Sequence, residues 1–160
     1  MQTKELLLKQ LEYTFHTEDW YPPLKDSLEG LTADQANWKP QGVAVNTIWE
    51  TVSHILYYKE RLLVQLQGET FENSVQSNDD TFTAQNSEDE WNAMLSRLFE
   101  NHNQLEKLIS SFNEEDFNKE FKGSKFAKMI SSINLHDAYH TGQIIQIRKL
   151  QGSWAAKRAF

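Results

Sequence analysis

The sequence predicts an all-α fold, a four-helix bundle formed as a single domain over residues 1–160. Apolar residues recur three and four positions apart in four long stretches, as on the buried face of a helix. Three predicted helices are preceded by Thr or Ser with Gln or Glu three positions later, which is the capping-box pattern. No segment alternates apolar and polar residues as a half-buried strand does. A chain of 160 residues is long enough to bury a sizeable core in one domain.

The first part of the chain predicts one long helix followed by two short ones. The long helix is expected from Thr3 to about Asp19, with Leu7, Leu8, Leu11 and Phe15 on its apolar face. The pair Pro22-Pro23 ends it, because proline lacks the backbone N–H and clashes with the preceding turn. A short helix is expected from Leu24 to Glu29 and is stopped by Gly30, and a helical turn follows the capping box of Thr32 and Gln35.

The second long helix is predicted from the capping box at Thr47 to about Gln67, and it ends at Gly68. Ile48, Val52, Ile55, Leu62 and Leu66 form its apolar stripe. The following segment, Glu69 to Asn86, is polar and lacks helical periodicity. Connections of this length usually cross the end of a bundle or line a site, and in a four-helix bundle they allow consecutive helices to run parallel.

Two further long helices complete the predicted bundle. The third starts at the capping box of Ser87 and Glu90 and runs to about Phe112. A charged loop is expected from Glu114 to Gly123, in which Asp116 to Phe121 can pair locally, and Ser124 is expected to cap the fourth helix, which ends near Gln151. Trp154 is expected to pack back on the bundle.

Composition narrows the classes of function. The formal charge of −7 argues against binding to DNA or RNA, which depends on Lys and Arg facing phosphates. No cysteine is present, so the chain has no disulfide, thiolate ligand or thiol nucleophile of its own. The segment MQTKELLLKQ has no apolar core typical of a signal peptide, and no apolar run reaches membrane-spanning length. A cytoplasmic protein without a membrane partner is the expectation that follows.

The pair His136 and His140 is the strongest chemical signal in the sequence. Residues four apart share a helix face, so both imidazoles can reach one metal ion. Ile133, Ile144 and Ile147 lie on the same stripe, so the pair is expected to face the core, where an unpaired polar group is costly. With five histidines in the chain, a chance pair at this spacing remains an alternative explanation.

The other three histidines carry weaker signals. His54 lies beside the apolar stripe of the second long helix, where a hydrogen-bonded core histidine is the usual situation. It gains a site role if the helix with His136 and His140 packs against it. His16 is expected to be exposed or at an interface, and His102, among Glu100, Asn101 and Asn103, is expected to face solvent.

Three segments together resemble the DinB-like superfamily of four-helix-bundle metalloproteins. They are Leu28-Glu29-Gly30-Leu31 leading to Asn37-Trp38-Lys39-Pro40, then TIWETVSHI from Thr47 to Ile55, and HDAYHTGQI from His136 to Ile144. The resemblance implies one divalent metal ion, Zn²⁺ or Ni²⁺, held by one histidine on the second long helix and two on the last. Those positions fall on His54, His136 and His140. The family's fold further implies parallel middle helices, and relatives form homodimers, which is the assembly expected here.

The resemblance also suggests an activity, because some relatives transfer small thiols such as bacillithiol, mycothiol or glutathione to electrophiles. The expected partners are therefore a small-molecule thiol and an electrophile. Arg61 and Arg148 are candidates to hold a cosubstrate carboxylate, although both are equally consistent with ordinary ion pairs. Two alternatives stay open: a non-catalytic, stress-related metal-binding or interaction module, and a plain bundle whose histidines are core polar groups.

Some neighbouring residues are less suited to the metal. Asp137 lies about 100° around the helix from His136, so it is not expected to be a ligand. The metalloprotease motif HExxH is absent, because no Glu lies between the two histidines. Tyr57, Tyr58 and Tyr139 are candidates to donate to a bound anion or simply to pack.

Overall fold

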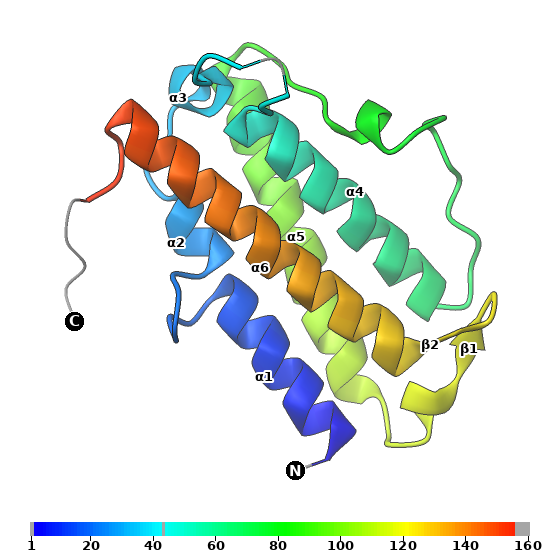
Figure 1. The fold of residues 1–160 in the computed structure, drawn as a ribbon. Helices are drawn as coiled ribbons and strands as arrows, with labels where there is room; N and C mark the ends of the chain where they lie inside the picture. Colours follow the sequence, from blue (N-terminus) through cyan, green and yellow to red (C-terminus); the bar gives the residue numbers. More distant parts are fainter. Residues whose placement is uncertain (1, 43, 156–160) are drawn as a thin grey trace.

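The computed structural model describes residues 2–42 and 44–155, and within them the chain is helical, as the sequence predicts (Figure 1). Four long helices form the bundle: α1 (Thr3–Phe15), α4 (Ile48–Leu66), α5 (Glu88–Ser111) and α6 (Phe126–Gln151). The smaller elements are α2 (Leu24–Leu28), α3 (Ala33–Asn37), the 3₁₀ turns η1 (Asp79–Thr81) and η2 (Asp116–Asn118), and the strands β1 (Glu120–Phe121) and β2 (Ser124–Lys125).

All three predicted capping boxes are present in the structure. The hydroxyls of Thr32, Thr47 and Ser87 each accept a hydrogen bond from the backbone N–H three residues later, and the Gln or Glu there bonds back. Such caps satisfy N–H groups that have no partner within the helix, and each contributes about 1 kcal/mol. They explain why the starts of α3, α4 and α5 are readable from local sequence.

Two predicted boundaries are wrong. Helix α1 ends at Phe15 instead of near Asp19, because the N–H groups of both His16 and Thr17 bond to the carbonyl of Glu12 and close the last turn. Ser124 does not cap α6; it pairs with Phe121 in a two-stranded hairpin, and Lys125 is the N-cap. Lys122 and Gly123 both have positive φ, at 48° and 79°, which is the geometry of a two-residue hairpin turn.

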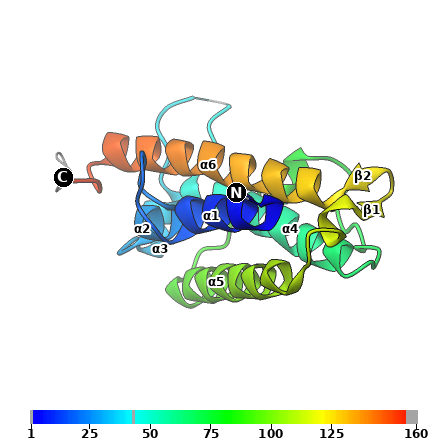
Figure 2. The same cartoon turned by 90° about the horizontal axis from the view of Figure 1, so that it is seen from below.

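The long helices are arranged so that α4 and α5 run in the same direction (Figure 1). The connection over residues 69–86 returns along the bundle from the end of α4 to the start of α5, as predicted. Seen from below, α1 and α4 lie between α6 on one side and α5 on the other, and each of them contacts both (Figure 2). Helices α5 and α6 are therefore diagonal to each other across the core.

The core consists of two apolar clusters that share the lengths of α4, α5 and α6. One contains Ile55, Leu98 and Ile144, and the other contains Leu62, Leu105 and Ile133. Lys59, His102, Asp137 and His140 are buried polar residues at positions between the two clusters on these helices, and His54 on α4 is buried opposite His136. A polar layer thus divides the core and holds the histidines that the sequence singled out.

Candidate metal centre

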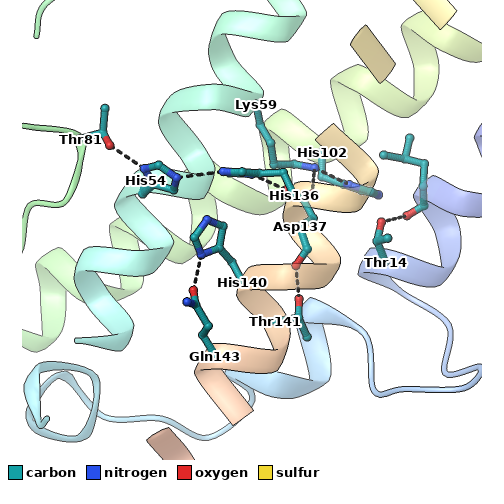
Figure 3. A network of polar contacts seen from close by, with 11 residues as sticks. Thr14, His54, Lys59, Thr81, His102, His136, Asp137, His140, Thr141 and Gln143 are labelled. Atoms are coloured by element: carbon teal, nitrogen blue, oxygen red, sulfur yellow. Dashed lines mark hydrogen bonds and ion pairs between the residues drawn. The ribbon is translucent and has the colours of Figure 1, made fainter. Parts of the chain in front are cut away.

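His54 on α4 and His136 and His140 on α6 come together in this polar layer (Figure 3). One potential ligand atom of each lies within 4.8 Å of the others, and the Nε2 atoms of His54 and His136 are 2.9 Å apart. His54 and His140 are buried and His136 is half-buried. The packing of α4 on α6 therefore produces the arrangement that would give His54 a site role.

Hydrogen bonds to the Nδ1 atoms of His54 and His140 fix the tautomers of these two rings. The Thr81 hydroxyl donates to the backbone carbonyl of Asn78 at 2.6 Å, so it can only accept from His54 Nδ1, also at 2.6 Å. His140 Nδ1 donates to Gln143 Oε1 at 2.6 Å, and the Gln143 amide in turn donates to Tyr139. Each ring therefore carries its hydrogen on Nδ1 and presents the Nε2 lone pair to the centre.

The environment also keeps these rings neutral, which is the state in which imidazole binds a metal. Burial lowers the pKa of His54 to about 3, and the neighbouring His136 and His140 add to that effect. Burial and the nearby His136 lower the pKa of His140 as well. Neither ring has to lose a proton near neutral pH before it can act as a ligand.

Beside His136 lies a buried ion pair. Lys59 Nζ is 2.7 Å from Asp137 Oδ2, and both side chains are fully buried. Burial acts to raise the pKa of the Asp137 carboxyl, but Lys59 and His136 outweigh it and hold the pKa below its ordinary value. The second carboxylate oxygen, Oδ1, lies 3.7 Å from His136 Nδ1, and neither atom has a hydrogen-bond partner within the described residues. A small movement would let Asp137 accept from His136 and direct Nε2 to the centre.

The donor set fits a divalent metal ion of intermediate softness. Three converging imidazole nitrogens suit Zn²⁺ or Ni²⁺, and a shared ion would relieve the close approach of the His54 and His136 Nε2 atoms. A cavity of about 430 Å³ opens on all three histidines, and Tyr58, Asn78, Phe82, Ile133 and Tyr139 also line it. Asn78 and Phe82 belong to the connection over residues 69–86, so this connection lines the site as well as crossing the bundle.

A comparison with protein families matches the model described as the DinB superfamily over residues 24–144, which is more than half of the chain. The chain belongs to the DinB superfamily. The matched span includes all three histidines of the centre. No curated protein and no solved structure matched this chain. None of the helices in the described residues is long and apolar enough to cross a membrane.

One histidine of this DinB protein was misjudged from sequence. His102 has no exposed surface, so the expectation that it faces solvent is wrong. Its polar neighbours suggested an exposed face, but His102 lies in register with Leu98, Leu105 and Ile109, and that apolar spacing is the informative signal. Burial, followed by the charge of Lys59 and the nearby His16, lowers the pKa of His102 to about 2.

The two candidate arginines have different positions. Arg148 is buried and donates to the backbone carbonyls of Ser27, Glu29 and Ser153, so it ties α6 to its neighbours and is not available to a substrate. Its guanidinium also lies over the ring of Trp154, which packs back on the bundle as expected. Arg61 is exposed and lines two cavities next to the metal centre. Tyr58 lines both of these cavities and also the cavity over the three histidines.

Three further residues that shape the centre carried no sequence prediction: Lys59, Thr81 and Gln143. Lys59 had a usable signal, because it stands between Ile55 and Leu62 on the apolar stripe of α4, where a lysine needs a buried partner. Thr81 had none, since its contact with His54 joins positions 27 residues apart. Gln143 is three residues from His140, a spacing at which helical side chains meet, but many glutamines stand at such positions without a role.

Proposed function

We propose that His54, His136 and His140 bind one divalent metal ion, Zn²⁺ or Ni²⁺. The proposal is supported by three imidazoles that each have a nitrogen within 4.8 Å of the others and that line one cavity. Three neutral protein ligands leave at least one position for water or substrate, which distinguishes catalytic from closed structural zinc sites.

Metal analysis of tag-free protein tests this assignment. After dialysis against a mild chelator, which removes weakly held ions, wild type should retain one ion per chain, and His136→Ala or His140→Ala should lose it. Lys149→Ala provides the control, because Lys149 is an exposed side chain on the same helix and is no part of the centre. Retention by both histidine variants, or loss in the control, would exclude the proposed ligand set.

We further propose that the centre supports transfer of a small thiol to an electrophile. The observation that carries this proposal is the cavity of about 430 Å³ over the three histidines, which lies in the size range of small-molecule sites. Because the chain has no cysteine, the sulfur nucleophile has to come from a cosubstrate. A bound metal ion would supply the acidification of that thiol near neutral pH. We propose that this activity takes place in the cytoplasm, because small thiols are kept reduced there.

The chain's own side chains can orient the two substrates. Tyr58, Asn78 and Tyr139 supply polar groups at the cavity wall, and Phe82 and Ile133 supply apolar surface. Arg61 lines a neighbouring cavity of about 190 Å³ together with Tyr58 and Asn78, so it is placed to bind a carboxylate at the far end of an extended thiol. In the reaction a carbon–sulfur bond forms, the leaving group departs with its bonding electrons, and the thiol proton passes to solvent.

The activity is tested with metal-loaded protein, 1-chloro-2,4-dinitrobenzene as electrophile, and glutathione, bacillithiol or cysteine as thiol. Wild type should release chloride faster than His136→Ala. Arg61→Ala should raise the KM for glutathione or bacillithiol without loss of bound metal. Arg97→Ala is the matched control, because Arg97 is exposed and pairs with Glu60. Confirmed metal occupancy without turnover above the His136→Ala level would favour a non-catalytic metal-binding module instead.

A further inference from the structure

A second group of metal-ligating side chains lies on the other side of Lys59 from the centre. It consists of His16, which follows the last residue of α1, and of His102 and Glu106, one turn apart on α5. One potential ligand atom of each residue lies within 4.8 Å of the others. His102 is fully buried, Glu106 is half-buried and His16 is exposed, so the group leads from the core to the surface. Figure 3 shows His102 beyond Lys59, away from His54 and His140.

One polar atom of the buried His102 side chain lacks a hydrogen-bond partner within the described residues. Its ring stacks on Phe15 with centroids 3.6 Å apart and planes 7° apart, and the edge contact with His16 has a centroid distance of 4.7 Å. Nε2 is buried and has no hydrogen-bond partner within the described residues. A buried polar atom without a partner costs about 1–3 kcal/mol, so either a bound species or a rearrangement has to satisfy it.

The charges around this group favour a cation. Lys59 and Asp137 form an ion pair at 2.7 Å, and their charges cancel. The Glu106 carboxylate adds one negative charge and receives no hydrogen bond from the described part of the chain. Opposing this, Lys59 Nζ lies 3.5 Å from His102 Nδ1, so this long hydrogen bond has to break and the ring hydrogen has to move to Nδ1 before Nε2 can bind an ion. The charge of Lys59 also repels a positive ion bound to the same ring. A cation is therefore expected to bind here more weakly than at the three histidines of the centre.

We propose that His16, His102 and Glu106 form a second divalent-metal site, which takes Zn²⁺ through His102 Nε2, the His16 imidazole and the Glu106 carboxylate. Two imidazoles and one carboxylate are an established zinc ligand set with a fourth position open to water. The ion would join the end of α1 to the middle of α5, whereas the hydrogen bond from Lys4 to the Ser110 carbonyl joins the start of α1 to the end of α5. Its role would be to stabilise the fold when metal is abundant.

The site is isolated by using His136→Ala to disable the first centre. Tag-free, metal-free protein is titrated with Zn²⁺ by calorimetry and with Co²⁺ by visible absorption. Wild type should bind two ions per chain in two phases, and His136→Ala should bind one ion with the weaker affinity. Adding Glu106→Gln or His16→Asn to His136→Ala should weaken this binding at least about tenfold, as expected for loss of one ligand. The visible absorption spectrum of bound Co²⁺ should also change in these double variants.

The control is Glu100→Gln in the same background, because Glu100 is an exposed carboxylate on the same helix. It should leave binding and the Co²⁺ spectrum unchanged. Circular dichroism confirms that each variant is folded, which is expected because the replaced side chains are not fully buried. The proposal is overturned if zinc binding by His136→Ala is unchanged by both Glu106→Gln and His16→Asn. It is also overturned if folded His136→Ala protein binds no zinc. Failure of the first centre alone would show as a single site in wild type that His136→Ala leaves intact.

Discussion

The ion pair of Lys59 and Asp137 connects the two helices that carry the three histidines. Both side chains are fully buried, and their polar atoms are 2.7 Å apart. Lys59→Met would leave the Asp137 carboxylate buried without its counter-charge, which costs about 3–5 kcal/mol. We expect urea unfolding to show a loss of stability of about this size.

The double variant Lys59→Met/Asp137→Leu separates the two roles of this pair. It should recover most of the lost stability, because replacing a buried ion pair by apolar residues is often neutral. Its metal affinity should stay roughly 10–100-fold below wild type, since the carboxylate 3.7 Å from His136 Nδ1 is gone. Wild-type affinity in the folded double variant would show that Asp137 does not orient His136.

The connection over residues 69–86 acts as a wall of the metal centre. Thr81 accepts a hydrogen bond from His54, and Phe82 stacks on the same ring with centroids 4.0 Å apart. Immobilising His54 by metal should therefore suppress local opening of this segment. Hydrogen exchange at residues 78–82 is expected to slow several-fold when Zn²⁺ is added, as measured by mass spectrometry.

The β1–β2 hairpin serves as the internal control, because it has no contact with the three histidines among the described residues. Its exchange should not change. Thr81→Val should bind metal roughly 10–100-fold more weakly and lose the protection. Unchanged exchange at residues 78–82 in protein shown to hold metal would rule out this coupling.

The exposed side of α6 is the surface through which we expect two molecules to associate. Leu135, Tyr139 and Leu150 are 68%, 62% and 55% exposed, and their spacing places them along one side of the helix. Apolar side chains grouped this way favour a symmetric dimer. Light scattering should give twice the 18.7 kDa of one chain, and Leu135→Glu should give a monomer.

Gln104→Glu is the control for assembly, because Gln104 is exposed on α5, the helix diagonal to α6 (Figure 2). It should remain dimeric. A wild-type particle containing one chain at micromolar concentration would contradict the proposed dimer.

Local sequence was sufficient for most of the helical framework. The capping boxes at Thr32, Thr47 and Ser87 and the apolar stripes involve residues within about four positions of each other, so their outcome depends little on the rest of the chain. The pairing of His136 and His140 is local in the same sense, and the family resemblance added His54. The structure brings the three together, as predicted.

The surroundings of these histidines depend on how distant elements pack. Asp137 was judged only by its angle to His136, yet α4 places Lys59 against it, 78 positions away in the chain. Thr81 reaches His54 because the long connection returns along α4, and His102 meets His16 because α1 packs on α5. Such contacts join residues whose spacing carries no periodic signal. The partners of these polar side chains and the group of His16, His102 and Glu106 therefore follow from tertiary packing alone.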